Sequence, residues 1–329
     1  MKLVIQIPCY NEAETLPVTM AALPRRLAGV DRVEWVVVND GSLDGTAEVA
    51  AARGADEVVG HPRRLGLARA FATGLATCLK RGADIIVNVD ADNQYSADDI
   101  PRLIEPILAA RADLVIGTRP IASMTHFTAA KRCLQRLGSW VVRKLSGIPV
   151  EDAPSGFRAL TRRAALRVNV FSGYTYTLET IIQAGQLGIG VECVPVRVNR
   201  VLRPSRLVRS VPRYVARSLL TILRIFVTYH PFRTFVALGA SLMLLGGAVG
   251  LRFVVYWAQG QGGGKVQSLI LAAVLLLMGF QLGVLGVLAD LISVNRRLLE
   301  EIQYLARSRA VGEAGSASPA TTSAPRGPS

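Results

Sequence analysis

The sequence has few cysteines, few acidic residues and none of the common glycine-rich phosphate motifs. Its four cysteines show no paired spacing of the kind that binds zinc, which suits a reducing cytosol. No G-x-G-x-x-G follows a strand-like run, which counts against a dinucleotide cofactor, and the absence of G-x-x-x-x-G-K-[ST] counts against a P-loop nucleotidase. Only 24 acidic residues oppose 38 lysines and arginines, so the formal net charge is +14. This excess of positive charge favours an anionic partner.

Two stretches of the chain lack charged residues altogether. TFVALGASLMLLGGAVGL lies between Arg233 and Arg252, and VQSLILAAVLLLMGFQLGVLGVLA begins after Lys265. About 20 apolar residues are needed to cross a hydrocarbon core of about 30 Å. Two buried helices of a soluble core are the alternative, but such cores rarely need apolar runs of this length. We therefore predict transmembrane helices over 233–258 and 266–292, joined as a hairpin because the segment between them is short.

Basic residues near the two apolar stretches predict their orientation. Arg224 and Arg233 precede the first stretch, Arg296 and Arg297 follow the second, and the linker offers only Lys265. Because basic flanks stay on the cytoplasmic side, we expect the preceding domain and both termini in the cytoplasm, at the cell (inner) membrane. The opening MKLVIQIPCYNE has too short an apolar stretch for a signal peptide.

The segment before the first apolar stretch is strongly basic. Between residues 193 and 233 there are nine arginines and no acidic residue. Arg213, Arg217 and Arg224 share one face of a helix, which is typical of a helix lying on an anionic membrane surface. A nucleic-acid surface is the alternative from charge alone. The adjoining apolar span favours lipid, so we predict a membrane partner and no nucleic acid.

Short apolar runs alternate with helical patterns over the first two hundred residues. The expected strands are 3–7, 35–39, 85–89 and 114–117, and the expected helices lie near 12–27, 45–53, 66–81 and 98–110. Such alternation predicts an α/β domain with a mostly parallel sheet, in which ligands lie beyond the carboxyl ends of the strands. Three polar clusters, PCYNE, NDGSLDG and DADNQ, follow three of these strands. We therefore expect them to converge.

The stretch VNVDADNQYS ends an apolar strand with Asp90 and Asp92, followed by Gln94. Two carboxylates so close together repel each other, so a cation is the expected partner. With the amide oxygen they make an incomplete shell suited to Mg²⁺ or Mn²⁺, which substrate phosphates and water complete. The alternative is an acidic turn that caps a helix starting near Ser96, with Asp99 in its first turn. Capping accounts for Ser96 but not for the carboxylate pair, so the metal site is favoured.

The other two polar clusters can also be explained by local structure alone. NDGSLDGT reads as a turn rich in Asp and Gly that opens a helix at Asp44 or Thr46. Its position facing the predicted metal site favours a nucleotide contact over a plain turn. A carboxylate such as Asp40 can accept hydrogen bonds from a base or a ribose. Glu12 of PCYNE can equally lie in the first turn of a helix, where negative charge is favourable.

Six motifs occur in the order and spacing of a known family: PCYNE, VVNDGSLDGT, RRLGLARAFATG, VDADNQYSADDI, IGTRP and DAPSGFRAL. The sequence resembles family-2 glycosyltransferases, in particular the dolichol- or polyprenol-phosphate sugar synthases related to dolichol-phosphate mannosyltransferase. The resemblance implies a GT-A-like nucleotide-sugar-binding domain followed by a two-helix transmembrane hairpin. The predicted domains are 1–205 (glycosyltransferase), 206–232 (basic amphipathic juxtamembrane helix), 233–258 and 266–292 (transmembrane helices) and 293–329 (cytoplasmic helix end and disordered tail).

The resemblance also implies roles for individual residues. The residues around the nucleotide would be Pro8, Tyr10, Glu12, Asp40 and Asp90. The metal ligands would be Asp92 and Gln94, with Asp90 beside them. The residues that bind phosphate or acceptor groups would be Arg119, Ser155 and Arg158, to which the basic segment adds Arg203 and Arg206. The catalytic residues would be Asp92 and Asp152, the latter near the acceptor. For Arg203 and Arg206, mere contact with anionic lipid is the alternative.

The implied reaction transfers a sugar, with inversion, from a GDP- or UDP-sugar to a membrane polyprenyl phosphate, for cell-envelope glycan or glycoprotein assembly. A phosphate monoester has a second pKa of about 6 and is largely dianionic near pH 7. A strong base is therefore unnecessary, and we expect Asp152 to orient a group instead. One alternative is a processive polysaccharide synthase, whose Q-x-x-R-W segment is absent here. Another is an inactive membrane scaffold, which would tolerate loss of Asp90, Asp92 or Gln94. A homo-oligomer is left open.

Overall fold

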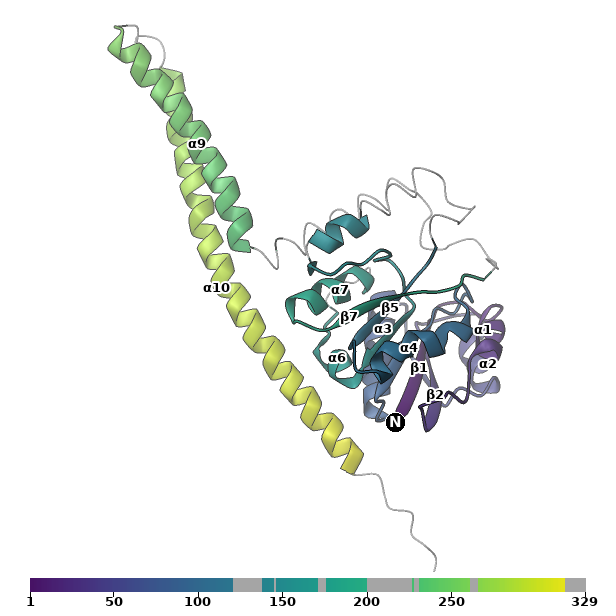
Figure 1. Cartoon of the computed structure of the whole chain (residues 1–329). Coiled ribbons are helices and arrows are strands. Elements are labelled where there is room, and N and C mark those ends of the chain that lie inside the picture. Colours follow the sequence, from purple (N-terminus) through teal and green to yellow (C-terminus); the bar gives the residue numbers. More distant parts are fainter. Residues whose placement is uncertain are drawn as a thin grey trace, which may run out of the picture. The chain divides into compact units, whose positions relative to one another are not determined.

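The computed structural model describes residues 1–120, 138–144, 146–170, 176–199, 227, 231–260 and 266–316. The chain divides into two compact units, Met1–Ser218 with Gln303–Ser329, and Leu219–Ile302. The first unit is an α/β domain, and the second holds two long apolar helices (Figure 1).

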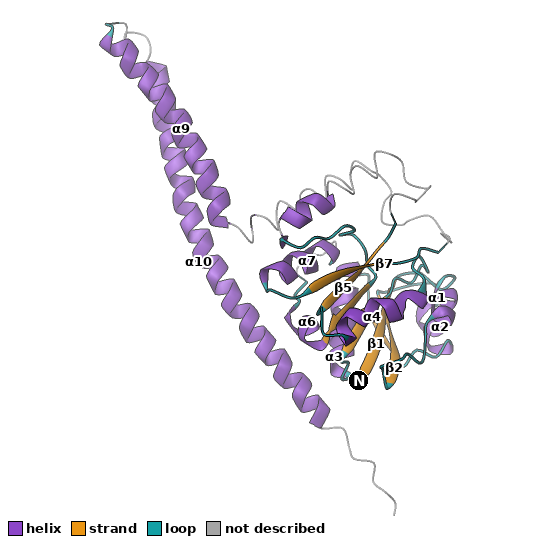
Figure 2. Ribbon diagram, viewed as in Figure 1, coloured by secondary structure: helices purple, strands orange, loops and turns teal. Residues whose placement is uncertain are grey.

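One sheet runs through the described part of the first unit (Figure 2). It has seven strands in the order β3-β2-β1-β4-β6-β5-β7. The strands are β1 (Lys2–Cys9), β2 (Arg32–Asn39), β3 (Glu57–Gly60), β4 (Ile85–Asn88), β5 (Leu114–Thr118), β6 (Arg158–Thr161) and β7 (Val191–Pro195). The pairs β3–β2, β2–β1, β1–β4 and β5–β7 are parallel, whereas β6 is antiparallel to β4 and β5. The sheet is therefore mostly parallel, which confirms the fold class predicted from the alternation of strands and helices.

The antiparallel strand β6 brings the SGFR segment to the functional edge. Parallel strands all end at one edge of a sheet, and an antiparallel strand begins at that edge. β6 begins at Arg158, which pairs with Asn88 at the end of β4. The loop before β6 therefore lies beside the polar residues that follow β4. β6 is absent from the predicted strands because its four residues, RALT, contain no continuous apolar run.

Helices cover both faces of the sheet. Those in the described part of the first unit include α1 (Leu16–Ala22), α2 (Thr46–Ala52), α3 (Leu67–Lys80), the 3₁₀ turn η1 (Ala97–Asp99), α4 (Ile100–Leu108), α6 (Arg162–Arg167) and α7 (Thr177–Gln186). Residues of α1, α2 and α4 share a core with Leu3, Ile5 and Ile7 of β1, while α3 and α6 contact each other on the opposite face. Strand side chains alternate between faces, so Gln6 points toward α3. A Cβ on Gly74 of α3 would lie 2.3 Å from Gln6 Oε1, so only glycine fits there.

The helix α1 is shorter than the helix predicted near 12–27. Pro17 lies in its first turn, and Pro24 follows its end at Ala22. Proline fits the first turn of a helix but cannot continue one, which explains the early end. The other three predicted helices correspond to α2, to α3, and to α4 with its preceding η1.

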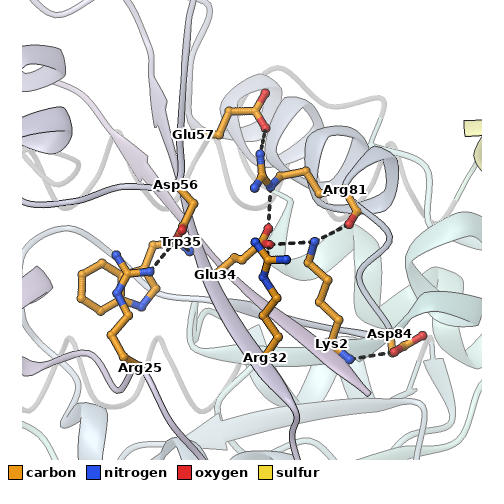
Figure 3. A network of polar contacts seen from close by, with 9 residues as sticks. All are labelled: Lys2, Arg25, Arg32, Glu34, Trp35, Asp56, Glu57, Arg81 and Asp84. Carbon is orange, nitrogen blue, oxygen red and sulfur yellow. Dashed lines mark hydrogen bonds and ion pairs between the residues drawn. The ribbon is translucent and has the colours of Figure 1, made fainter. Parts of the chain in front are cut away.

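The amino-terminal edge of the sheet carries a buried ion network (Figure 3). The Glu34 side chain is 1% exposed, and its carboxylate pairs with Lys2 Nζ at 2.9 Å, Arg32 Nε at 2.7 Å and Arg81 Nε at 2.6 Å. Burial acts to raise the pKa of Glu34, but the hydrogen bonds from Arg81 and Lys2 outweigh it, so this pKa lies below its usual value. These contacts tie β1, β2 and the end of α3 together, so the edge opposite the polar clusters serves stability.

The second unit contains α9 (Pro231–Ala258) and most of α10 (Val266–Ser316). By length and composition, each helix is able to cross a membrane, and the predicted spans 233–258 and 266–292 fall within them. A Cβ on Gly239 would lie 2.6 Å from the carbonyl oxygen of Gly279, and a Cβ on Gly279 would lie 2.7 Å from that of Gly239. Small residues let the backbones of membrane helices approach closely. The two helices therefore pack as a hairpin through their glycines.

Parts of the predicted domain plan lie outside the described residues. These are most of the amphipathic helix 206–232 and the end of the tail, 317–329. The helix α10 continues to Ser316, so it covers all of the described residues of the predicted segment 293–329. The domain boundary at residue 205 stays a prediction.

Candidate active site

Polar side chains gather where β1, β2, β4 and β5 end and where β6 begins. The backbone N of Asp40 donates to the carbonyl oxygen of Cys9 at 2.8 Å, which joins the loops after β2 and β1. Thr19 Oγ1 of α1 donates to the carbonyl oxygen of Ala91 at 2.9 Å. The clusters PCYNE and NDGSLDG are therefore in contact, and DADNQ is held against the helix that follows PCYNE.

The Asp90 carboxylate lies against the loop before β6. A Cβ on Gly156 would lie 2.6 Å from Asp90 Oδ2 and 2.9 Å from both Asp90 Oδ1 and the hydroxyl of Tyr176. Only glycine leaves room for the carboxylate at this position. The pKa of Asp90 is raised to about 7, first by burial and second by the Asp92 carboxylate. Arg119 and Arg158 act to lower this pKa but do not offset the other two effects, so negative charge at this point is only partly compensated by the protein.

A buried amide next to Asp90 ties this loop to β4. Asn88 Nδ2 donates to the carbonyl oxygen of Gly156 at 2.8 Å and to the hydroxyl of Tyr176 at 2.9 Å, and Asn88 Oδ1 accepts from Gln6 Nε2 at 2.9 Å. The Tyr176 ring stacks on Phe71, with ring centroids 3.8 Å apart. Neither Asn88 nor Tyr176 is among the predicted site residues. The signal for Asn88 is a polar residue inside the apolar strand IIVNV, whereas the sequence does not mark Tyr176.

Asp92 and Gln94 lie half-buried on the turn that follows. Asp92 Oδ1 accepts from the backbone N of Gln94 at 3.2 Å, across Asn93, whose φ of +53° is in the left-handed region. Among the described residues, no group of three or more His, Cys, Asp or Glu is placed to hold a metal. The predicted metal site is not a group of that type, because its ligands are two carboxylates and one amide. Hard oxygen ligands beside the incompletely compensated charge of Asp90 fit Mg²⁺ or Mn²⁺.

The alternative for this stretch is an acidic turn that caps a helix starting near Ser96. A helical turn does start there, but the side chains do not cap it. Ser96 is the N-cap of η1, but its side chain makes no capping hydrogen bond. Asp99 instead accepts from the backbone N of Arg197 at 2.6 Å and from its Nε at 3.0 Å. Asp99 therefore binds the segment after β7 rather than its own helix.

Arg119, which follows β5, forms a buried ion pair with Asp152. Its Nε donates to Asp152 Oδ2 at 2.7 Å and its Nη2 to Asp152 Oδ1 at 2.9 Å. The two side chains are 11% and 0% exposed. A two-point contact of this kind fixes the plane of the guanidinium. This geometry is what we expect if Asp152 orients a group rather than removing a proton.

Arg158 and Ser155 are fully buried and shape the loop before β6. Arg158 donates from Nε to the carbonyl oxygen of Ser155 at 2.8 Å, from Nη2 to that of Ala153 at 2.9 Å, and from Nη1 to Thr180 Oγ1. Ser155 Oγ lies 3.2 Å from the hydroxyl of Tyr95. The structure thus makes Arg158 a support of the loop backbone. The phosphate contacts of Arg158 and Ser155 stay predictions.

The buried carboxylate of Asp40 holds the loop after β3. Its Oδ1 accepts from the backbone N of Leu65 at 2.8 Å and lies 2.8 Å from His61 Nδ1, and its Oδ2 accepts from the backbone N of Gly66 at 2.8 Å. Three contacts on one carboxylate position this loop beside the end of β2. The contact of Asp40 with a base or a ribose stays a prediction.

The first cluster presents Tyr10 to the same loop. The guanidinium carbon of Arg64 lies 4.2 Å from the centroid of the Tyr10 ring, within the range of a cation–π contact. Pro8 is buried within β1, and Glu12 is buried and accepts from Thr15 Oγ1 at 2.6 Å. The nucleotide contacts of Pro8, Tyr10 and Glu12 stay predictions.

Arg203 and Arg206, which were predicted to meet the acceptor phosphate, lie outside the described residues, as does Cys133. The three described cysteines, Cys9, Cys78 and Cys193, are free.

Residues 4–168 match the family described as Glycosyl transferase family 2. The chain is 30% identical over 218 residues to the undecaprenyl-phosphate mannosyltransferase of Micrococcus luteus, which covers 63% of this chain and 88% of the relative. It is 29% identical over 201 residues to the polyprenol monophosphomannose synthase of Mycolicibacterium smegmatis, which covers 58% of this chain and 74% of the relative.

The fold is similar to that of glucosyl-3-phosphoglycerate synthase from Mycobacterium tuberculosis, crystallised with Mn²⁺, UDP and glucosyl-3-phosphoglycerate. The TM-score is 0.52 at 23% identity, over 67% of this chain and 79% of that one. The strand order, the polar edge built from β1, β2, β4, β5 and β6, and the family match over half of the chain agree with one another. The protein is therefore a member of glycosyltransferase family 2, with a GT-A-like domain followed by two apolar helices.

Proposed function

We propose that this protein transfers one sugar, with inversion at the anomeric carbon, from a GDP- or UDP-linked donor to a membrane polyprenyl phosphate. The product would be a polyprenyl-phosphate-sugar for the assembly of cell-envelope glycans or glycoproteins. The relatives named as an undecaprenyl-phosphate mannosyltransferase and a polyprenol monophosphomannose synthase support this acceptor class. Their names also make mannose the first sugar to test.

The observation that carries the proposal is the incompletely compensated carboxylate pair at the end of β4. Asp90 lies against Gly156, and its raised pKa reflects burial and the repulsion from Asp92, which Arg119 and Arg158 offset only in part. A half-buried pair of like charges is unfavourable unless a cation joins it. Nucleotide-diphosphate sugars carry the two phosphates that complete such a cation's shell.

Asp90, Asp92 and Gln94 would hold Mg²⁺ or Mn²⁺. When bound, the ion supplies electrostatic stabilisation of the charge that develops on the departing nucleotide diphosphate. The fold neighbour crystallised with Mn²⁺ and UDP supports the use of a divalent ion in this fold. The ring of Tyr10, stacked with Arg64, offers a flat surface for a base next to this site.

Asp152 holds Arg119 so that its guanidinium meets phosphate oxygens, to which the planar fork of arginine is suited. The attacking group is a phosphate, which is largely dianionic near pH 7 because its second pKa is about 6. A base that removes a proton is therefore unnecessary. The carboxylate of Asp152, bound at both oxygens by Arg119, acts through that arginine.

The two apolar helices α9 and α10 support a multi-pass protein of the cell (inner) membrane. In this arrangement the catalytic domain and both termini are cytoplasmic, since basic residues flank the hairpin on that side. The acceptor keeps its chain in lipid and presents its phosphate at the headgroup plane. Arg203 and Arg206 precede the first span and are assigned to this phosphate.

The test uses the full-length protein in detergent with undecaprenyl phosphate, MgCl₂ or MnCl₂, and a panel of GDP- and UDP-sugars that includes GDP-mannose. Mass spectrometry of the lipid extract should show the acceptor with one added sugar. Asp92→Asn should abolish the product, while Asp98→Asn, on a side chain 79% exposed in the same loop, should keep it. No glycolipid with any donor would overturn the proposal, and a product with many sugars would favour a processive synthase.

A further inference from the structure

One residue outside the predicted motifs hydrogen-bonds the backbone of the carboxylate turn at three successive positions. Asn199 Nδ2 donates to the carbonyl oxygens of Asn93 and Tyr95, both at 3.1 Å. The backbone N of Asn199 donates to the carbonyl oxygen of Gln94 at 2.9 Å. Asn199 Nδ2 also lies 3.4 Å from Asn93 Oδ1. All three carbonyl groups from residue 93 to residue 95 are therefore bound by Asn199.

The segment that carries this residue is itself anchored. The buried carboxylate of Asp99 accepts from the backbone N of Arg197 at 2.6 Å and from its Nε at 3.0 Å. An antiparallel bridge pairs Val198 with Tyr95. Residues 197–199 therefore lie along the turn in a defined register.

Binding three successive carbonyl groups fixes the peptide planes on both sides of Gln94. Asn93 adopts the left-handed region at φ +53°, which is unfavourable for a residue with a Cβ unless its surroundings hold it there. On the other side of the turn, Asp92 Oδ1 accepts from the backbone N of Gln94. The directions of the Asp92 and Gln94 side chains follow from these planes.

We propose that Asn199 is a positioning residue, which holds the turn of residues 92–95 so that the oxygens of Asp92 and Gln94 meet one divalent cation. The proposal rests on the proposed function, because it takes Asp92 and Gln94 as ligands of a cation that binds with a nucleotide diphosphate. The side chain of Asn199 acts through the turn, since its Nδ2 faces backbone carbonyl groups. Without these hydrogen bonds, the turn has to be ordered when the cation binds, which weakens binding.

Two substitutions separate the hydrogen bonds from the volume of the side chain. Asn199→Leu keeps the volume and removes both donors of the amide, whereas Asn199→Ala removes both donors and most of the volume. Asn169→Ala is the control, because it removes an asparagine side chain of the same unit that lies outside the site. All variants are full-length proteins in detergent, and their thermal unfolding is measured first.

The first measurement is hydrogen exchange without any ligand. We expect the peptide that covers residues 90–96 to exchange about 10-fold faster in both Asn199 variants and at the wild-type rate in Asn169→Ala. The second measurement is a Mn²⁺ titration by calorimetry, in the presence of GDP and, separately, of UDP. We expect Mn²⁺ to bind about 10- to 100-fold more weakly to both Asn199 variants, and GDP or UDP without metal to bind as in the wild type.

Wild-type exchange and wild-type Mn²⁺ affinity in Asn199→Leu would overturn the proposal. Faster exchange with unchanged Mn²⁺ affinity would overturn it too, because the order of the turn would then be immaterial to the metal. If the wild-type protein binds no Mn²⁺ with either nucleotide, the proposed function fails and the metal role of Asn199 fails with it. The exchange data are independent of that outcome and show by themselves whether Asn199 holds the turn.

Discussion

Replacing Asp152 by asparagine asks whether this carboxylate works through Arg119 or directly on the substrate. Asp152 is fully buried and accepts from Arg119 at both oxygens, at 2.7 and 2.9 Å. Asparagine has nearly the same shape and keeps one acceptor, but it places an NH₂ group against the guanidinium in place of the second. The substitution therefore removes one charge and one hydrogen bond while the volume is unchanged.

The expected loss follows from the strength of that contact. A hydrogen bond to a charged group contributes about 1.5–3 kcal/mol. If the whole of it is lost in the transition state, kcat/KM falls by about 10- to 100-fold. Asp92→Asn removes the charge of a proposed metal ligand, so its loss should exceed about 100-fold. We therefore expect Asp152→Asn to retain more activity than Asp92→Asn.

The assay measures glycolipid formation in the wild type, in Asp152→Asn, in Arg119→Ala and in the double variant. If Asp152 acts through Arg119, adding Asp152→Asn to Arg119→Ala should change kcat/KM by less than about 3-fold. Equal losses in both backgrounds would refute this reasoning, as would an Asp152→Asn variant no more active than Asp92→Asn. Thermal unfolding is the control, because an arginine left without its buried partner also destabilises the fold.

Two further substitutions test the two edges of the sheet. In Gly156→Ala the new methyl carbon would lie 2.6 Å from Asp90 Oδ2, so we expect at least about a 10-fold loss of glycolipid formation, with Gly60→Ala, whose Cβ meets open space, as the unchanged control. Wild-type activity in Gly156→Ala would contradict the crowding of Asp90. In Glu34→Gln we expect the free energy of unfolding at pH 7 to fall by about 2 kcal/mol, with activity per folded molecule unchanged. Because the pKa of Glu34 is lowered on folding, its stabilisation is present above the unfolded value of 4.5 and is lost as pH falls through the folded value. Unfolding free energies of the wild type and Glu34→Gln should therefore converge below pH 4.5, and curves that stay parallel would contradict the role of the network.

Strands with continuous apolar runs could be predicted from the sequence, and strands without such a run could not. LVIQI and WVVVN lie inside β1 and β2, because a strand buried on both faces needs apolar residues on both. The strands β4 and β5 are short but begin with the apolar runs IIV and LVI, whereas β3, β6 and β7 are equally short and have no such run. Their pairing depends on partners that are distant in the sequence, and a window of four residues carries no periodicity. The antiparallel direction of β6, which brings Gly156 to Asp90, is therefore visible only in the structure.

The candidate site divides in the same way. Asp90 and Asp92 could be identified as candidate ligands because two carboxylates one residue apart are a local signal, which favours a cation. The partner of a lone charge is not a local property: Asp152 lies 33 residues from Arg119, and Asn199 lies 106 residues from Asn93. A residue type says what a side chain can bind but not what it already binds. Arg158 is the clearest case, since an arginine expected to bind phosphate donates to carbonyl oxygens of its own loop.

A carboxylate at each edge of the sheet has a shifted pKa, and the two shifts have opposite directions. At one edge, the Glu34 carboxylate is surrounded by three cationic side chains, and its pKa is lowered. At the other edge, burial and the Asp92 carboxylate raise the pKa of Asp90 more than Arg119 and Arg158 lower it. Both carboxylates belong to one compact unit, and the same fold compensates the buried charge of Glu34 in full. Leaving the charge of Asp90 incompletely compensated lowers the stability of the protein alone and raises its affinity for a cation, as expected of a binding site rather than of a core.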